Sequence, residues 1–396
     1  MAGRRPRSAA HGWIAAVACL SVSLSLPLTP GPSHAAAASR PRTTLAALAF
    51  SSARVGFAVG QVCGALGRCA GLVLRTRDGG AHWRVRTLPT HALTGIDPLG
   101  ATRIWVWGPS GLWRTTDGGA RWSRSAWPSW QSGDGPQFEI VSFASSADGW
   151  LAEGGVGCAM QGCGTYLFTS SDGGATWRPV ATDVPRGPGG PHVPHNLPWA
   201  DYGSAVDLGD ARGLLFASDP VGTALRTGNG GRMWSQRAMF LNGYAAAFTA
   251  GGDGWAVGET CTSGCRRIDR RRYAVDATTD GGVVWRRTRD WVPASPGGGD
   301  GLPTELAPEL AGAGVWAAIA YRDPPTRCAQ GCGAGARAIV PLGDPTRPTP
   351  LPAGWVGVAV AALSPCVTWA VVNTPNGDRL ARTTDGGRSW RLVWPV

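Results

Sequence analysis

Short apolar segments recur along this chain, and each has a large aromatic or aliphatic residue near its middle. Neighbouring segments lie 41 to 64 residues apart. Alternating apolar and polar positions surround them, and in the first unit they predict four strands, at residues 45–50, 55–60, 71–76 and 83–88. The seven segments centre on Phe57, Trp105, Trp150, Leu214, Trp255, Trp316 and Trp369.

A polar turn follows the third predicted strand of most units. It consists of Asp or Asn, two glycines, two variable residues and Trp. Asp and Asn side chains bond the backbone a residue or two onward, and glycine adopts positive φ freely, so each copy predicts a tight hairpin turn. The closing Trp then anchors the fourth strand. The six copies carry Asp78, Asp117, Asp172, Asn229, Asp280 and Asp385.

The units repeat often enough to decide the fold class. A gap of 105 residues separates Asp280 from Asp385, so we expect a seventh, decayed turn near residues 343–349. Seven units of four short strands predict an all-β, seven-bladed β-propeller of antiparallel blades over residues 43–396. Blade one should close on blade seven by packing, without a swapped strand. A set of β-sandwich domains is the rival interpretation, but it needs no identical turn in every unit.

The turn carries a family resemblance. The pattern Ser/Thr-x-Asp/Asn-x-Gly-x-x-Trp resembles the Asp box, or BNR repeat, of sialidases and related propellers. Its pairing with a strand such as GWAVG at 254–258 is similar to the photosystem II stability/assembly-factor-like propellers. The resemblance implies that the Asp boxes are structural and that ligands bind on the opposite face. It does not transfer an activity, because Asp boxes occur in proteins with unrelated functions.

Composition indicates export. The 396 residues carry a net charge of +11, and all 37 basic residues are Arg, which we interpret first as coding bias. Residues 1–35 resemble an export signal, with Arg4, Arg5 and Arg7 before an apolar stretch and small residues before Ala36. We expect cleavage there, a linker at 36–42 and an extracytoplasmic protein. An uncleaved N-terminal anchor is the alternative.

Eight cysteines fall into local pairs, each between the second and third strands of a blade. An oxidising compartment makes hairpin disulfides the default interpretation, since four separated blades would not converge on one metal ion. We expect no metal and no cofactor. Cys366 has no partner, and we expect it to be a small core residue. The expected disulfides join Cys63 to Cys69, Cys158 to Cys163, Cys261 to Cys265, and Cys328 to Cys332.

Candidate binding residues gather on the rim opposite the Asp boxes. An arginine run follows Cys265 and could hold carboxylates or phosphates by paired hydrogen bonds, although a solvated charge run is the alternative. The long loop 185–203 carries two histidines, which could ligate a metal or simply lie on the surface. Two glutamates at equivalent strand ends could serve a glycosidase or cap loops. These residues are Arg266, Arg267, Arg270, Arg271, Arg272, His192, His195, Glu153 and Glu259.

The remaining motifs argue against an enzyme. The chain lacks the Phe/Tyr-Arg-Ile/Leu-Pro string of sialidases, and also Gly-x-Ser-x-Gly, His-Glu-x-x-His and phosphate-loop motifs. We therefore predict an exported, monomeric, non-enzymatic propeller that binds a protein or an anionic polymer, such as acidic polysaccharide or lipid headgroups. Nucleic acid is a poor match for an exported protein. The alternative function is a carbohydrate-active enzyme or lectin of the Asp-box type.

Overall fold

The computed structural model describes most of the chain after residue 41. The chain divides into two compact units, Met1–Ser39 and Arg40–Val396, and all described residues belong to the second. The predicted export signal therefore lies outside them. The described residues are 42–64, 67–126, 138–156, 164–180, 202–209, 212–217, 223–230, 235–238, 242–249, 252–259, 273–291, 301–310, 314–321, 338–342 and 350–394.

Every described element is a β-strand, and the strands form seven antiparallel sheets. Among the described residues, no helix has the length and apolar character needed to cross a membrane. Blade one consists of β1 (Arg42–Phe50), β2 (Gly56–Cys63), β3 (Cys69–Thr76) and β4 (Arg84–Leu88). Blade two consists of β5 (Gly95–Leu99), β6 (Arg103–Gly108), β7 (Gly111–Thr115) and β8 (Ser123–Arg124). Blade three consists of β9 (Phe138–Phe143), β10 (Gly149–Val156), β11 (Gly164–Ser170) and β12 (Arg178–Pro179).

The later blades repeat this arrangement with one exception. Blade four consists of β13 (Tyr202–Gly209), β14 (Arg212–Ala217), β15 (Thr223–Thr227) and β16 (Ser235–Ala238). Blade five consists of β17 (Asn242–Phe248), β18 (Gly254–Glu259), β19 (Tyr273–Thr278) and β20 (Arg286–Trp291). The described part of blade six consists of β21 (Gly301–Pro308), β22 (Val315–Tyr321) and β23 (Ala338–Pro341). Blade seven consists of β24 (Val356–Ala362), β25 (Thr368–Thr374), β26 (Gly377–Thr383) and β27 (Arg391–Trp394).

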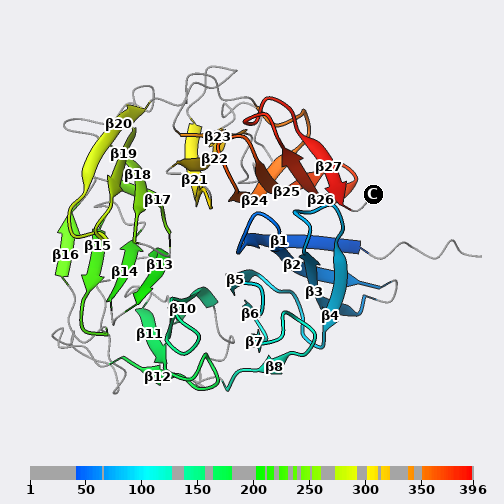
Figure 1. Cartoon of the computed structure of the whole chain (residues 1–396), viewed down its shortest axis with the longest axis horizontal. Coiled ribbons are helices and arrows are strands. Elements are labelled where there is room, and N and C mark those ends of the chain that lie inside the picture. Colours follow the sequence, from blue (N-terminus) through cyan, green and yellow to red (C-terminus); the bar gives the residue numbers. More distant parts are fainter. Residues whose placement is uncertain are drawn as a thin grey trace, which may run out of the picture. The chain divides into compact units, whose positions relative to one another are not determined.

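The sheets follow one another around a ring (Figure 1). The first strands of the sheets contact one another in the order β1, β5, β9, β13, β17, β21 and β24, and β24 returns to β1. Within each sheet the strands pair in chain order. The prediction of an all-β propeller with small antiparallel sheets is therefore confirmed.

The prediction of four strands in every blade is wrong for the part of the chain that the structure describes. Six sheets have four strands, and the sheet of blade six has three. Beyond β23, Pro350 makes only an isolated bridge with Ala338. Proline lacks an N–H group and cannot continue a hydrogen-bonded ladder, which accounts for the weak pairing at this position. The expected decayed turn at 343–349 lies outside the described residues.

Ring closure uses packing and a buried hydrogen bond. Arg42 pairs with Cys63, so β1 belongs to the sheet of blade one and not to that of blade seven. One apolar cluster joins Leu48 of blade one to Trp369 and Val371 of blade seven. The backbone N–H of Leu45 also donates to Asp378 of blade seven at 2.8 Å. Closure without a swapped strand follows, as the sequence predicted.

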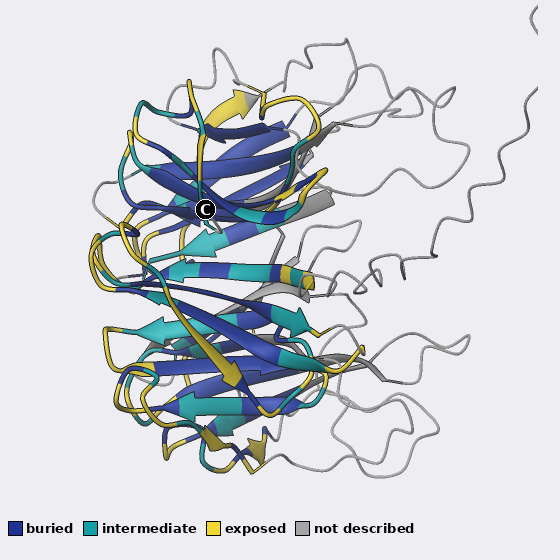
Figure 2. Ribbon diagram, turned by 90° about the vertical axis from the view of Figure 1, so that its right-hand side faces the viewer, coloured by how far each residue is buried: buried dark blue, intermediate teal, exposed yellow. Residues whose placement is uncertain are grey.

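The core lies mainly between neighbouring blades. Separate apolar clusters fill the junctions of blades one and two, two and three, five and six, and six and seven. Figure 2 shows the buried residues along the inner strands, and the exposed residues mainly on turns and edge strands. Because each junction is packed by its own side chains, its contents depend on which residues two particular blades contribute.

Candidate binding pocket between blades one and two

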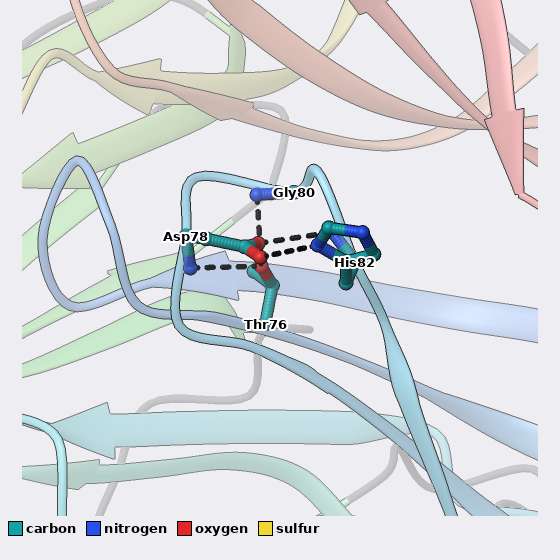
Figure 3. A network of polar contacts seen from close by, with 4 residues as sticks. All are labelled: Thr76, Asp78, Gly80 and His82. Carbon is teal, nitrogen blue, oxygen red and sulfur yellow. Dashed lines mark hydrogen bonds and ion pairs between the residues drawn. The ribbon is translucent and has the colours of Figure 1, made fainter.

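The repeated turn, which we call the DGG turn, is organised by a buried hydroxyl. In blade one, Thr76 Oγ1 donates to Asp78 Oδ1 at 2.8 Å and accepts from the N–H of Gly80 at 2.8 Å (Figure 3). Asp78 Oδ1 in turn accepts from the N–H of His82 at 3.0 Å, and Asp78 Oδ2 lies 2.7 Å from His82 Nδ1. Thr76 is only 1% exposed. The hydroxyl and carboxylate together accept the N–H groups of Asp78, Gly80 and His82, and the N–H of Gly79 donates to the carbonyl of Arg54.

The same contacts recur around the ring. The Ser or Thr two positions before the Asp donates to its carboxylate in blades one, two, three, five and seven, and Thr227 donates to Asn229 in blade four. In the turns of blades one, two, three, five and seven the carboxylate accepts N–H groups three or four residues onward. The expected reach of one or two residues was wrong, because two glycines with positive φ carry the chain back over the carboxylate.

The second glycine of each turn permits close packing onto the preceding blade. A Cβ added to Gly80 would lie 2.1 Å from the indole of Trp369 in blade seven. A Cβ on Gly282 would lie 2.8 Å from Leu214 of blade four, and one on Gly387 would lie 3.4 Å from Trp316 of blade six. Trp369, Leu214 and Trp316, each at the centre of a second strand, therefore fill the space under the next blade's turn.

The junction of blades one and two departs from this rule. Its central residue is Phe57 instead of Trp, and no atom of Phe57 is among the three nearest to a Cβ added to Gly119. Those atoms belong to Trp122 of the same turn, the closest at 3.5 Å. A pocket of about 360 Å³ occupies this place, with Phe57, Val73, Gly118, Gly119 and Trp122 among its walls.

Four arginines of blade one line the pocket: Arg75, Arg77, Arg84 and Arg86. Arg75 pairs directly across the sheet with Arg84, and Val73 pairs with Arg86. Like charges opposite each other on neighbouring strands destabilise a sheet. Arg77, Arg84 and Arg86 are exposed, and within the described residues no Asp or Glu forms an ion pair with them. The cluster therefore gives the pocket a net positive charge, because the lining holds four arginines and two aspartates.

Arg75 has a second role, which ties blade one to blade two. Its guanidinium donates to the carbonyls of Gly118 and Ala101, the latter at 3.0 Å, and lies 5.6 Å above the ring of Phe57. Burial lowers the pKa of Arg75, and the charges of Arg77 and Arg84 lower it further. Arg114 bonds carbonyls of the next turn in the same way. Coding bias alone therefore does not account for these arginines.

Two carboxylates and a histidine complete the lining: Asp78, Asp117 and His82. Hydrogen bonds from the amide and ring of His82, and then from Thr76, hold the pKa of Asp78 far below its usual range. Hydrogen bonds from the amide of Arg121 and the hydroxyl of Thr115 lower the pKa of Asp117. Both groups are thus carboxylates at neutral pH. Asp117 Oδ1 serves its own turn, whereas no described residue bonds Oδ2.

The pocket lies on the rim of the DGG turns, not on the opposite rim where the sequence placed the ligand. The strand register sets this geometry, since Thr76 pairs with Gly56 at one end of the hairpin and Cys69 pairs with Cys63 at the other. Of the predicted binding residues, Glu153 lies in β10 and Glu259 ends β18, in blades three and five, but their side chains are outside the description. The Arg run 266–272, His192 and His195 lie outside the described residues.

The cysteines give one confirmation and one correction. Cys63 and Cys69 form a disulfide, as predicted. Cys366 is a free, exposed cysteine, so its predicted place in the core is wrong. It precedes β25 in the turn at 364–367, whose N–H and C=O groups bond each other and keep the side chain outside the sheet.

The other three predicted disulfides are not among the bonds that the structure describes, because their cysteines lie outside the described residues. The disulfides of blades three, five and six therefore stay predictions. They would join Cys158 and Cys163, Cys261 and Cys265, and Cys328 and Cys332.

The described part of the chain shows no cluster of three or more His, Cys, Asp or Glu side chains that could hold a metal ion. The arrangement between blades one and two instead suits an anion, which the three exposed guanidinium groups of Arg77, Arg84 and Arg86 can bind by charge-assisted hydrogen bonds. Trp122 adds a half-buried aromatic wall. The fold and this site define a β-propeller with a cationic pocket between two blades.

Comparisons with known proteins support the fold. No model of a known protein family matches this chain. A xyloglucanase of Paenibacillus sp is 30% identical over 209 residues, which is 46% of this chain and 19% of the xyloglucanase. The chain thus matches about a fifth of that relative's length. A puromycin hydrolase structure superposes with a TM-score of 0.54 at 14% identity, over 89% of this chain and 54% of the hydrolase.

A structure described as YCF48 bound to D1 peptide is similar with a TM-score of 0.49 at 17% identity. It covers 77% of this chain and 82% of the YCF48 chain. At these identities, structural similarity concerns the propeller fold and carries no activity with it.

Proposed function

We propose that this chain is a non-enzymatic binding propeller, which holds an anionic group of a protein or polymer in the pocket between blades one and two. The observation that carries the proposal is the cluster of Arg75, Arg77, Arg84 and Arg86 around one cavity. Folding brings these like charges together at a cost, and an anion in the pocket offsets that cost.

The proposal includes an extracytoplasmic location. The disulfide between Cys63 and Cys69 supports it, because disulfides persist mainly in oxidising compartments. The signal-like segment at 1–35 supports it as well. We also infer that the DGG turns are Asp boxes with a structural role, since their hydrogen bonds remain mainly within each turn. We also propose that the Arg run 266–272, which lies outside the described residues, binds the same kind of partner.

The test removes the charge and keeps the fold. In one variant, Arg77, Arg84 and Arg86 become Gln, and in the control, Arg178, Arg286 and Arg391 become Gln. The control residues are exposed and follow the turn Trp of their own blades, as Arg84 follows Trp83. Binding is measured to immobilised acidic polysaccharide, anionic lipid vesicles and an acidic peptide. We expect the first variant to lose about tenfold or more in affinity for at least one probe.

The control variant should bind as the wild type does. Raising the salt concentration should weaken wild-type binding in parallel with the charge removal, because exposed charges are screened beyond about 8–10 Å at physiological ionic strength. Equal binding of both variants to every probe would refute the proposal.

The 209-residue similarity to a xyloglucanase favours a second candidate, a carbohydrate-active enzyme. Glu153 and Glu259 would then be the first residues to examine. Incubation with xyloglucan, followed by measurement of new reducing ends, tests this activity. Release of reducing ends that disappears in Glu153→Gln or Glu259→Gln would favour the enzyme over the binding propeller.

A further inference from the structure

We propose that the pocket between blades one and two takes one charged sugar residue of an acidic polysaccharide, bearing a carboxylate or a sulfate. This inference rests on the proposed function and names the ligand class of the same site. It follows from three features of the lining: the size of the cavity, the distribution of charge and the mixture of donors and acceptors.

The size of the cavity favours a ring. At about 360 Å³ it lies at the lower end of the range for small-molecule sites. A lone sulfate or phosphate ion would leave much of this volume to water. Phe57 forms the floor beneath the guanidinium of Arg75, and Trp122 supplies a half-buried aromatic wall. Such a wall contacts the C–H face of a sugar ring and excludes water from it.

The distribution of charge places the anionic group. Arg77, Arg84 and Arg86 are exposed at the blade-one side of the pocket, on the adjacent strands and turn of β3 and β4. Guanidinium groups bind carboxylate and sulfate oxygens by parallel hydrogen bonds. The anionic substituent of the ring therefore points toward blade one.

The acceptors in the pocket distinguish a sugar from other anions. Asp117 presents Oδ2 beside the blade-two turn, and no described residue bonds it. A carboxylate repels a second anionic group and accepts only from donors such as hydroxyls. A sugar acid carries an anionic group and several hydroxyl donors on one ring. A phospholipid with a glycerol, serine or ethanolamine headgroup lacks the ring, and the slender side chains of an acidic peptide do not fill the cavity.

The shape of the pocket offers a variant that separates ring binding from surface charge. Phe57→Trp introduces at this junction the residue that stands in blades two, three, five, six and seven, and its indole would extend under Gly119 as that of Trp369 does under Gly80. Phe57→Leu is the matched control, because it also changes a buried ring but leaves the cavity open. Thermal unfolding of both variants verifies that each is folded.

Binding is measured by calorimetry with four probes. They are a short oligogalacturonate, its neutral methyl ester, a sulfated disaccharide and an acidic peptide of similar charge. We expect wild type and Phe57→Leu to bind the uronate or the sulfated sugar. Wild type should bind the methyl ester with about tenfold or more lower affinity than the uronate. The Phe57→Trp variant should likewise bind the charged sugars with about tenfold or more lower affinity than wild type. A tenfold loss corresponds to one charge-assisted contact. The affinities for the uronate and for the sulfated sugar show whether the arginines bind a carboxylate or a sulfate.

The outcomes separate the two proposals. In one outcome, the acidic peptide binds as well as the sugars and Phe57→Trp leaves this binding unchanged. The arginines then act only as a surface patch, so the sugar proposal is overturned while the proposed function stands. If no probe binds the wild type, or if replacing Arg77, Arg84 and Arg86 by Gln changes no affinity, both proposals are overturned. Loss of uronate binding in Phe57→Trp but not in Phe57→Leu supports the sugar site.

Discussion

Two blade junctions with the same turn differ in what lies beneath it. Between blades seven and one, Trp369 is completely buried and its ring lies 5.7 Å from Phe50 and 5.6 Å from Trp83. Between blades one and two, Phe57 takes the place of Trp369. Pro98 stands at the strand position of Phe50, since it pairs with Ile104 as Phe50 pairs with Gly56. Three rings pack together under the turn of one junction, whereas a pocket lies beside the apolar cluster of the other.

The residues of the DGG turn are therefore enough to set the shape of the turn, but they do not set which side chains fill the space below it. Thr76 and Thr115 make the same bonds to their Asp and second Gly. Gly80 and Gly119 even share a φ of 87°. The difference arises from the side chains that the blades contribute below the turn, Phe57 in place of Trp369 and Pro98 in place of Phe50. A binding site can thus form at one junction of a repeat protein without any change in the repeated turn.

The largest expected effect comes from filling the space under each turn. Both Gly80→Ala and Gly119→Ala force alanine into positive φ, which costs about 1–2 kcal/mol. Gly80→Ala also drives a methyl group into Trp369, and overpacking of this kind adds about 1–3 kcal/mol. Urea unfolding should therefore show a clearly greater loss for Gly80→Ala. Equal losses would mean that the two junctions are equally filled.

A smaller and equal effect is expected from the buried hydroxyls. Thr76→Val and Thr115→Val each leave the N–H of the second glycine without its acceptor, and each should cost about 1–2 kcal/mol. Denaturant midpoints of the two variants should agree with each other. A loss at only one junction would show that the turns are not equivalent, and the comparison would then need a cause within the turn itself.

The smallest expected effect is a loss of folding stability at low pH, which arises from the turn carboxylates. Hydrogen bonds from the hydroxyl and amide of Ser389 lower the pKa of Asp385 to about 2, and the pKa values of Asp78 and Asp117 are lowered too. A carboxyl whose pKa is lowered by folding stabilises the protein above its unfolded pKa of about 3.9, and this stabilisation is lost as the pH falls toward the folded pKa.

The melting temperature of the wild type should accordingly fall between about pH 5 and pH 2. The melting temperatures of Asp78→Asn and Asp117→Asn should each fall less over the same range, because Asn does not titrate. Asn229 already occupies the corresponding position in blade four. An identical acid profile for wild type and both variants would contradict the assignment of these carboxylates. The difference from wild type should be larger for Asp78→Asn, because Asp78 also bonds the ring of His82 whereas Asp117 has no such partner among the described residues.

Local sequence was enough to predict the repeated turn, the strand pattern of blade one and the disulfide between Cys63 and Cys69. These features depend on bonds between residues close in the chain. Two features were not predicted: the three-stranded sheet in the described part of blade six, and the exposure of Cys366. Apolar runs and spacing do not report which backbone groups find partners. The central role of Thr76 was readable in principle, since Ser or Thr stands two positions before every Asp or Asn of the repeat.

A ring of similar blades can be predicted from the sequence alone, because each turn is specified by its own glycines, carboxylate and hydroxyl. The position of the pocket depends on the tertiary structure. Arg75 and Arg84 become neighbours through strand register, and both line a cavity with Gly118 of the next blade. The cavity itself exists because Phe57 does not fill the space under Gly119 as Trp369 fills that under Gly80. Such distances between blades follow from packing, which no single repeat encodes.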